Sequence, residues 1–385
     1  MSREHVLIAG VSARAAAESA ARAGFVVTAI DAFADLDQHP SVRAIELSPT
    51  FSPRRAATFS REVTCDAAAY LSNFENHPSA VRLLALDRPV WGNPPDVLQR
   101  VRDPIALFNA LRRRGIAVPE SRVPESPGTS ARPDDRKWMM KPLASGGGHR
   151  IRLWNDGSHV PPHYYLQELI EGVPGSIVFV SAGGASVALG VSFQIVGDRT
   201  FGVDGYRYCG NILVPAGDRV FDRDDDLVSA AIDLAAAVTQ DFGLVGLNGI
   251  DFVARDGIPY LVEVNPRWCA SMELVERAHD LSMFAAHADA CRSGELPPFD
   301  RARLRHHDQA LGRAVVFARR NVLVGDTAPW LADDDIRDVP RAGTRIQAGR
   351  PVCTVFGSAR TTSACLVALS ERAEMVHSRM AIWPA

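Results

Sequence analysis

The first thirty residues alternate between apolar runs and a small-residue stretch: VLIAG (6–10), VSARAAAESAARAG (11–24) and FVVTAID (25–31). The two apolar runs have the length of buried strands, and the alanine-rich stretch between them ends at Gly24, as helices commonly do. This pattern predicts a strand–helix–strand unit of the kind that builds parallel sheets. Further short apolar runs at AAAYLSN and VRLLAL extend this α/β domain over residues 1–100.

The pattern changes after residue 100. A helix is predicted at DPIALFNALRRRG (103–115), followed by a Pro- and Ser-rich loop, VPESPGTSARPDD (123–135). Short strands and turns then alternate up to Pro266, interrupted by a helix at DLVSAAIDLAAAVTQDFG (226–243). Past Pro297 and Pro298 the sequence becomes strand-like with Gly/Pro turns and ends in a helix, SERAEMVHSRM. We therefore expect a middle domain over residues 101–300 and a small β-rich subdomain over 301–385.

Composition narrows the class of protein. The chain has 385 residues, 46% of them hydrophobic, and a net charge of −3, which indicates a soluble globular protein without a basic field for nucleic acid. No apolar run is long enough to span a bilayer, and the first one is too short for a signal peptide. Six scattered cysteines without a CxxC pair favour free thiols in a reducing compartment. We expect a cytoplasmic protein that contacts neither nucleic acid nor membrane.

Lysine use singles out the segment KWMMKPLASGGGHRI (137–151). The chain has 42 Lys and Arg, but its only two lysines are Lys137 and Lys141. An apolar strand would present Lys141 at its end, since Pro142 cannot continue a ladder. The backbone N–H groups of Ser145, Gly146, Gly147 and Gly148 could then close over phosphate oxygens beside the ammonium. The alternative is a Gly-rich hairpin turn beside an exposed lysine.

The segment YYLQELIEG (164–172) reads as a buried strand with polar interruptions. If it lies between two lobes, its backbone could pair with an adenine edge, and Glu168 or Glu171 could reach a ribose. An ordinary strand with solvent-facing glutamates is the alternative.

The most specific pattern is a hairpin, NGIDFVARDGIPYLVEVNPR (248–267), with a turn at Asp256–Gly257. Glu263 and Asn265 are two residues apart on a strand and therefore share a face. Together with Asp251 they would supply the oxygen ligands that Mg²⁺ prefers. A hairpin with incidental acids is the alternative.

Whether Asp251 joins that face depends on the hairpin loop. A two-residue loop would place Asp251 opposite Val262 and turn it away. A three-residue loop over residues 255–257 would place it opposite Leu261, on the metal face. We predict the three-residue loop, because it brings the apolar residues Ile250, Phe252, Val262 and Val264 together on the core face.

Three motifs follow one another along the chain: a strand with Lys-Pro before a Gly-rich loop, a strand with Gln-Glu, and a hairpin that ends in Glu-x-Asn-Pro-Arg. With these motifs in this order, the chain resembles the ATP-grasp superfamily over about residues 1–300. The resemblance implies a Rossmann-like N-terminal domain and a two-lobed domain that holds ATP between α+β lobes. It also implies that Lys141 contacts ATP phosphates and that Arg267 faces the γ-phosphate or an acyl phosphate. The implied nucleotide site includes Gln167, Glu168, Leu169, Ile170 and Glu171, and the implied Mg²⁺ ligands are Asp251, Glu263 and Asn265.

Two positions depart from the family pattern. Pro104 stands where many members have a second phosphate-binding lysine, so we expect Arg100 or Arg102 to substitute. Many members also have a ribose-binding glutamate after the glycine that ends the hinge strand. This chain has no glutamate directly after the corresponding Gly172, and Glu171 is the candidate for that role.

The resemblance is closest to members that join a small-molecule carboxylate to an amine through an acyl phosphate. Such a ligase would belong to coenzyme or amino-acid-derived metabolite synthesis, for example as a glutamate or other amino-acid ligase in one-carbon coenzyme assembly. The alternatives are a kinase or carbamate-forming enzyme of the same fold, and a nucleotide-binding regulator without turnover. A homodimer formed through the C-terminal subdomain is a further expectation.

Two segments offer substrate contacts. FGVDGYRYCGNILVP (201–215) reads as a Gly-bounded loop that could cover the acceptor with Tyr206, Arg207, Tyr208 and Asn211. Arg207 is the candidate carboxylate clamp, with surface decoration as the alternative. In SNFENHP, Glu75 follows an apolar run and could hold a substrate amine, although a polar strand end fits equally well.

Overall fold

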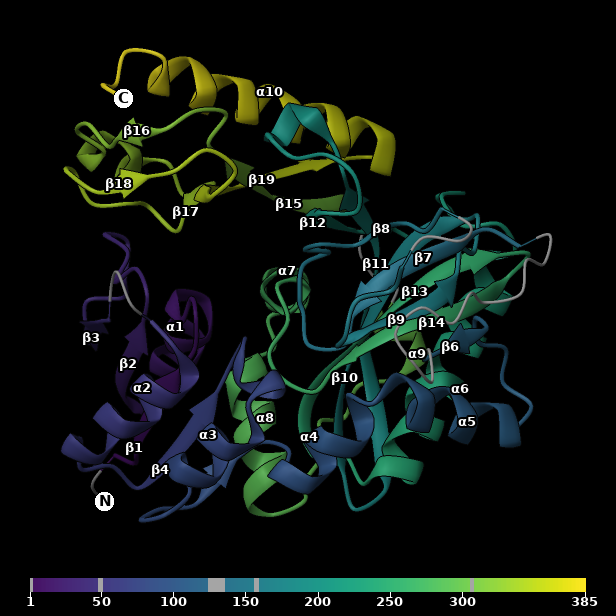
Figure 1. Ribbon diagram of the computed structural model, residues 1–385. Coiled ribbons are helices and arrows are strands. Elements are labelled where there is room, and N and C mark those ends of the chain that lie inside the picture. Colours follow the sequence, from purple (N-terminus) through teal and green to yellow (C-terminus); the bar gives the residue numbers. More distant parts are fainter. Residues whose placement is uncertain (1–2, 48–50, 124–135, 156–158, 305–307) are drawn as a thin grey trace.

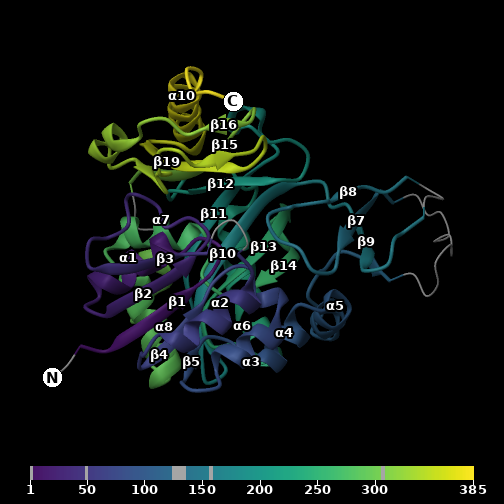
Figure 2. The same ribbon diagram turned by 60° about the vertical axis from the view of Figure 1, so that its left-hand side comes forward.

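The computed structural model describes residues 3–47, 51–123, 136–155, 159–304 and 308–385. Residues 124–135, most of the predicted Pro- and Ser-rich loop, lie outside this part of the chain. The chain forms an N-terminal α/β domain, a large lobe that continues into the C-terminal residues, and a small lobe on one side (Figure 1). Figure 2 shows the small lobe projecting from the rest of the molecule.

The N-terminal domain is built on a parallel sheet with helices on both faces. Its strands follow the order β3-β2-β1-β4-β5 and are β1 (His5–Ala9), β2 (Val26–Asp31), β3 (Val42–Glu46), β4 (Ala67–Tyr70) and β5 (Val90–Trp91). The helices are α1 (Arg14–Arg22) and α8 (Met283–Arg292) on one face, and α2 (Pro53–Phe59) and α3 (Pro78–Leu84) on the other. The predicted strand–helix–strand unit is confirmed, and the run VRLLAL lies in α3 rather than in a strand.

The large lobe is built on a sheet of antiparallel strands with helices packed against it. Its eight-stranded sheet has the order β14-β13-β10-β11-β12-β15-β19-β17. The strands are β10 (Val173–Ala182), β11 (Ala185–Val196), β12 (Tyr208–Leu213), β13 (Gly246–Arg255), β14 (Ile258–Asn265), β15 (Ala310–Phe317), β17 (Ile336–Arg337) and β19 (Pro351–Ala359). The flanking helices are α4 (Pro95–Val101), α5 (Pro104–Arg113), α6 (Asp224–Phe242), α7 (Ser271–His279) and α9 (Arg301–Leu304).

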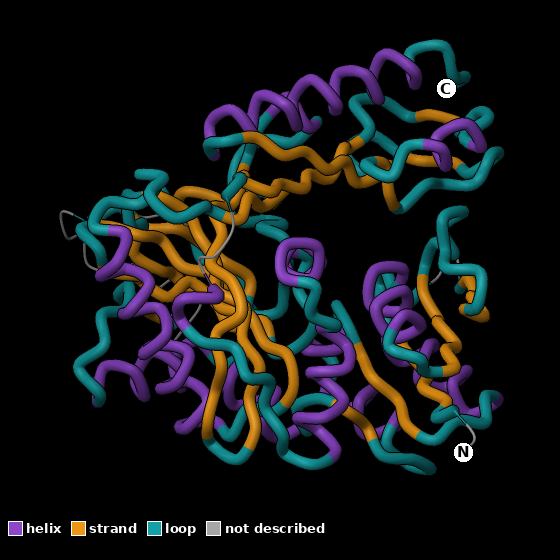
Figure 3. The backbone as a smooth tube through the Cα atoms, turned by 180° about the vertical axis from the view of Figure 1, so that it is seen from behind, coloured by secondary structure: helices purple, strands orange, loops and turns teal. Residues whose placement is uncertain are grey.

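The same sheet crosses the boundary predicted at residue 300. β15 pairs with β12 on one side and with β19 on the other, so the C-terminal strands extend the sheet of the large lobe. Helix α10 (Thr362–Met380) packs along β15 and β19, and a small ribbon of β16 (Val322–Leu323) and β18 (Arg345–Ile346) lies nearby (Figure 3). The division into residues 1–100, 101–300 and 301–385 therefore stays a prediction about sequence organisation.

The small lobe is a four-stranded sheet with its own apolar cluster. Its order is β6-β9-β7-β8, formed by β6 (Ser121–Arg122), β9 (Tyr164–Glu168), β7 (Trp138–Pro142) and β8 (Arg152–Leu153). The cluster consists of Trp138, Met140, Trp154, Val160 and Leu166. The resulting mixed α/β fold agrees with the sequence-based fold class. No helix in the described part of the chain is both long and apolar enough to cross a membrane.

Arg14 joins the N-terminal domain to helix α7 and to the C-terminal residues of the large lobe. Its side chain is fully buried at the start of α1. Arg14 Nη2 donates to Glu273 Oε1 of α7 (2.7 Å), and Nε donates to Asp338 Oδ1 in the C-terminal part (2.9 Å). A buried cation compensated by acids from separate elements fixes the position of those elements, because removing it leaves uncompensated charges in a low-dielectric interior.

We predict that Arg14→Ala lowers the free energy of unfolding by about 3–5 kcal/mol, the usual cost of breaking a buried ion pair. The matched control is Arg22→Ala on the same helix, where the Arg22 side chain is 51% exposed and pairs with Glu276. That control should cost less than about 1 kcal/mol. Urea unfolding followed by circular dichroism measures both, and equal effects of the two variants would contradict the role of Arg14.

Candidate active site

The hairpin of β13 and β14 places Asp251 directly opposite Glu263, by a route that the sequence did not predict. Arg255 pairs with Ile258, so the loop has two residues, Asp256 and Gly257, and the predicted three-residue loop is wrong. Both loop residues have positive φ (55° and 78°), which suits the tight turns that match strand twist. Sequence letters alone do not decide between these two loop lengths.

A β-bulge then shifts the pairing of the two strands by one residue. Phe252 pairs with Leu261, but Asp251 pairs with Glu263, so Val262 is the extra residue. Without the bulge, the two-residue loop would have set Asp251 against Val262 and away from the other acid. Ile250 pairs with Val264 beyond the bulge, so Asp251 shares the face of Glu263. The core face holds Ile250, Phe252 and Val264 as predicted, but Leu261 takes the place predicted for Val262, which is half-buried.

Asp251, Glu263 and Asn265 form a set of oxygen donors at the edge of this sheet. Asp251 Oδ1 accepts from Gln194 Nε2 (2.7 Å) and Oδ2 accepts from Asn265 Nδ2 (2.9 Å). Burial and the neighbouring Glu263 carboxylate raise the pKa of Asp251 to about 7. Two half-buried carboxylates that repel each other fit a divalent cation, which would relieve the repulsion.

The donor set is too small to hold an ion alone. Among the described residues, no group of three or more His, Cys, Asp or Glu side chains converges on one point. The Asn265 carbonyl would therefore have to supply a third protein ligand, and other ligands would come from phosphate oxygens and water. Mg²⁺ commonly binds proteins in this way, through one or two carboxylates and substrate phosphates.

Arg267 lies between the hairpin and the N-terminal domain. Its Nη2 donates to Asn265 Oδ1 (3.0 Å) and lies 2.9 Å from Glu75 Oε1. Burial opposes the charged form, but the Glu75 carboxylate outweighs it and raises the pKa of Arg267. Glu75 is 2% exposed, and its Oε2 has no hydrogen-bond partner among the residues that the structure describes. Glu75 thus orients Arg267, and its predicted contact with a substrate amine stays a prediction.

Of the two arginines proposed to replace the missing lysine, Arg102 lies in the site. Its Nη1 donates to Glu263 Oε2 (3.3 Å), and its Nη2 donates to the carbonyl of Ser145 (2.8 Å). Arg100 instead donates to the carbonyl of Phe242 (3.0 Å). Although burial acts in the opposite direction, Arg102, Lys141 and Arg267 together lower the pKa of Glu263.

Lys141 is buried, not exposed as the alternative interpretation required. It stands on β7 with 4% exposure, and Nζ donates to Gln167 Oε1 on β9 (2.8 Å). Gln167 is fully buried, and within the described part of the chain its Nε2 has no hydrogen-bond partner. Lys141 also lies near enough to lower the pKa of Glu263, which places the small lobe's cation over the hairpin.

The rest of the predicted nucleotide strand is partly occupied by contacts within the chain. Glu168 Oε2 accepts from the N–H of Glu120 (3.1 Å), and the N–H of Leu169 donates to the carbonyl of Lys137 (2.8 Å). Ile170 is buried. Glu171 is 71% exposed and pairs with Lys137 at 2.6 Å. Contacts of these residues with a nucleotide stay predictions.

The glycine-rich loop touches the large lobe. The N–H of Tyr208 donates to the carbonyl of Gly147 (3.2 Å), and a Cβ at Gly148 would lie 1.8 Å from the carbonyl oxygen of Tyr206. Gly148 also has φ of 73°. Only glycine permits this close approach with this backbone conformation. By contrast, a Cβ at Gly146 would meet nothing within 4 Å.

The predicted substrate residues divide between two places. Tyr208 Oη donates to Asn211 Oδ1, and Asn211 Nδ2 donates to Ser192 Oγ (2.9 Å), within a polar row on the sheet. Tyr206 is half-buried against Gly148. Arg207 points instead to the C-terminal residues, where Nη2 donates to the carbonyl of Gly349 (2.8 Å). It lies over the Phe317 ring at 4.7 Å. The clamp role of Arg207 stays a prediction.

Sequence reasoning missed several polar residues of the site. Gln194 binds Asp251, and Asn76 accepts from Arg102 Nη2 (3.1 Å). Gln194 lies in an otherwise apolar run, FQIV, and a polar residue on a predicted buried strand is the signal that could have marked it. Nothing in the sequence marks Asn76.

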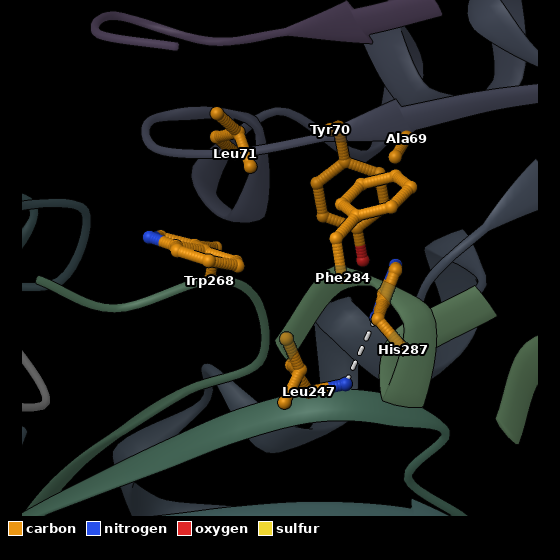
Figure 4. A pocket seen from close by; sticks show the side chains of 7 residues that line it. All are labelled: Ala69, Tyr70, Leu71, Leu247, Trp268, Phe284 and His287. Carbon is orange, nitrogen blue, oxygen red and sulfur yellow. Dashed lines mark hydrogen bonds between the residues drawn. The ribbon is translucent and has the colours of Figure 1, made fainter. Parts of the chain in front are cut away.

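A small cavity lies behind the site, between the N-terminal domain and β13. Its volume is about 10 Å³, room for about one water, and Figure 4 shows the mainly apolar side chains around it. His287 Nδ1 accepts from the N–H of Leu247 (2.9 Å), and burial lowers the pKa of His287 to about 4. The neutral histidine and the size of the cavity make it part of the core and not a substrate site.

Comparisons with known proteins agree with this geometry. Residues 101–271 match the family model of the ATP-grasp domain, so this part of the chain is an ATP-grasp domain. The L-amino acid ligase of Bacillus licheniformis has a similar structure (TM-score 0.68, 14% identity), with 97% of this chain and 98% of that chain covered. The biotin carboxylase domain of the Hydrogenobacter thermophilus 2-oxoglutarate carboxylase, solved with MgADP and bicarbonate, has a TM-score of 0.69 at 13% identity. That likeness covers 99% of this chain and 90% of that one.

A curated relative spans almost the whole chain as well. An uncharacterized protein of Methanocaldococcus jannaschii is 20% identical over 373 residues, which cover 91% of this chain and 87% of that protein. The expected ATP-grasp domain is therefore confirmed over residues 101–271, and the expected fold class is confirmed over nearly the whole chain. At these identities the solved structures establish the fold, while their substrates belong to those proteins alone.

We predict that Gly148→Ala weakens binding of Mg²⁺ with a non-hydrolysable ATP analogue by at least about 10-fold, which corresponds to about 1.4 kcal/mol. The reason is that the added methyl group forces the loop away from Tyr206. Gly146→Ala is the matched control and should bind like the wild type. Isothermal titration calorimetry measures both, and equal affinity of Gly148→Ala and wild type would show that the loop contact does not matter for the nucleotide.

Proposed function

We propose that the protein is an ATP-dependent ligase that joins a small-molecule carboxylate to an amine through an acyl phosphate, with release of ADP and phosphate. The observation that carries this proposal is the convergence of Asp251, Glu263 and Asn265 with three cations. Arg102 donates a hydrogen bond to Glu263, and Arg267 donates one to Asn265. The ammonium group of Lys141, on the small lobe, stabilises the charged form of Glu263 electrostatically.

In this proposal each part of the site has a separate task. Asp251, Glu263 and Asn265 would hold Mg²⁺, which when bound offsets negative charge on nucleotide phosphates. Lys141 and the backbone N–H groups of residues 145–148 bind phosphate oxygens. The strand from Gln167 to Ile170 presents backbone groups to the base.

Arg267 is the residue that we assign to the reacting group. Glu75 and Asn265 fix its guanidinium from two sides, so it is oriented before substrate binds. A cation held in this way stabilises negative charge as it develops on the transferring phosphoryl group, without reorganisation at the moment of reaction.

The proposed reaction needs no covalent nucleophile from the protein. An oxygen of the substrate carboxylate attacks the γ-phosphorus of ATP and ADP leaves, which gives the acyl phosphate. The amine nitrogen then attacks the acyl carbon, phosphate leaves with the bonding electron pair, and the nitrogen loses a proton. Positioning and electrostatic stabilisation supply most of the catalysis in such phosphoryl transfers.

The likeness to an L-amino acid ligase supports an amine acceptor that is an amino acid or a related metabolite. We retain as part of this proposal a role in coenzyme or amino-acid-derived metabolite synthesis in the cytoplasm, including glutamate ligation in one-carbon coenzyme assembly. The likeness to a biotin carboxylase domain, solved with bicarbonate, keeps a carbamate-forming enzyme as the second candidate.

Product analysis with Mg-ATP and pools of acids and amines tests the proposal. We expect ADP and free phosphate only when both an acid and an amine are present. ADP without free phosphate would identify a kinase, turnover that requires bicarbonate would identify carbamate formation, and AMP with pyrophosphate would contradict an acyl phosphate. ATP binding without turnover across broad pools would favour a regulator.

The two lysines allow a sharp comparison. Lys141→Ala should lower kcat by about 100-fold or more, because a buried ammonium that binds phosphate oxygens is removed. Lys137→Ala, four residues earlier, should retain wild-type turnover, since Lys137 is 70% exposed and pairs only with exposed Glu171. Steady-state ADP release measures both, with circular dichroism to confirm folding. Wild-type turnover by Lys141→Ala would exclude Lys141 from the phosphate site.

A further inference from the structure

A second group of cations lies at the far side of the glycine-rich loop, and the proposed chemistry does not use it. His149 and Arg150 directly follow the loop, Arg207 lies in the segment that the loop touches, and Arg350 lies in the C-terminal part. Arg150 and Arg350 are exposed, and neither side chain has a hydrogen-bond or ion-pair partner in the described part of the chain. Arg207 has no ion-pair partner among the described residues either, although its guanidinium donates to the carbonyl of Gly349.

Backbone contacts bring the three segments together. Gly148 lies against the carbonyl of Tyr206, and its added Cβ would be 3.1 Å from the Cα of Arg207. On the other side, Arg207 Nη2 donates to the carbonyl of Gly349, the neighbour of Arg350. The Phe317 ring under the Arg207 guanidinium limits its movement. Arg207 is therefore held between the loop arginine and the C-terminal arginine.

The backbone at Arg150 has an uncommon conformation. Its φ is 62°, in the left-handed region that bulky side chains rarely adopt. Three glycines stand nearby at residues 146–148, followed by His149, yet this position carries an arginine. A residue held in such a conformation commonly has a functional task.

The charges of this group repel one another. Burial and the cations Arg207, Arg350 and Arg150 lower the pKa of His149. Burial and Arg350 lower the pKa of Arg207, and of the nearby acids only Asp204 is a main opposing influence. Like charges gathered without acids raise the energy of the unliganded protein, and an anion would relieve that cost.

This group is separate from the cations of the proposed ATP site. The charges that act most strongly on Glu263 are Arg102, Lys141 and Arg267. Those that act most strongly on His149 are Arg207, Arg350 and Arg150. One group surrounds the proposed metal ligands, and the other faces the junction of the small lobe with the C-terminal residues.

We propose that His149, Arg150, Arg207 and Arg350 bind an anionic group of the acceptor substrate, a phosphate or a carboxylate distinct from the carboxylate that reacts. The inference rests on the proposed ligase function and narrows its substrate class to molecules with a second anionic end. Guanidinium groups suit this task because their planar donors match the paired oxygens of carboxylate and phosphate. Because the segments come from the small lobe, the large lobe and the C-terminal residues, such an anion would also hold the loop closed.

Inorganic phosphate is the probe for this site. The full chain is first saturated with Mg²⁺ and a non-hydrolysable ATP analogue, so that the proposed nucleotide site is filled, and phosphate is then titrated by calorimetry. We expect saturable binding that weakens by at least about 10-fold in Arg350→Gln and in Arg150→Gln, because each loses a charge-assisted hydrogen bond. Arg360→Gln, an exposed residue of the C-terminal part that does not act on His149, is the matched control and should bind phosphate like the wild type.

The outcomes separate the two proposals. Failure of the ATP analogue to bind would overturn the proposed function itself. Binding of the analogue without saturable phosphate binding, or equal phosphate affinity in all variants, would overturn the second anion site. Phosphate binding that the analogue abolishes would assign these cations to the nucleotide, which also contradicts the proposal.

Discussion

Two carboxylates held face to face on neighbouring strands, Asp251 and Glu263, set the electrostatics of the site. Their repulsion, together with burial, raises the pKa of Asp251, while Glu263 stays charged because cations approach it from two directions. Arg102 comes from the end of α4 and Lys141 from the small lobe, so the pair ties elements that are far apart in the chain. An arrangement of this kind costs free energy in the unliganded protein, and a divalent cation with phosphate oxygens would recover it.

The register of one hairpin shows how far the sequence could lead. That Glu263 and Asn265 share a face follows from the two-residue period of a strand, and this needed no structure. Whether Asp251 joins them depends on a bulge at Val262, and a bulge is decided by packing on both faces of the sheet rather than by local letters. Asp251 reached the expected face although the expected loop was wrong, because the bulge shifts the pairing by one residue and places Leu261 in the core in place of Val262.

Contacts between distant segments could not be predicted from the sequence, for a different reason. Local patterns predicted the helix at residues 103–115, but the reach of Arg102 to Glu263 and Ser145 depends on how three segments meet. The same holds for β15 and β19, which look like a separate subdomain along the chain and yet extend the sheet of the large lobe. Arg14 was predicted only as part of the alanine-rich helix that ends at Gly24, and in the structure acids from α7 and the C-terminal part compensate its buried charge.

The cationic side chains of this protein form three groups, which differ in how far nearby acidic side chains compensate their charge. Around Arg14, acids from within the protein compensate the cation, and the result is a fixed junction. Around Glu263, cations and acids balance each other only in part, which leaves room for a metal ion and phosphates. At His149 and Arg207 the cations face each other with little acid nearby, so the missing charge has to come from outside. Charge balance thus separates structural from ligand-binding clusters, because a folded chain tolerates an unbalanced cluster chiefly where a ligand completes it.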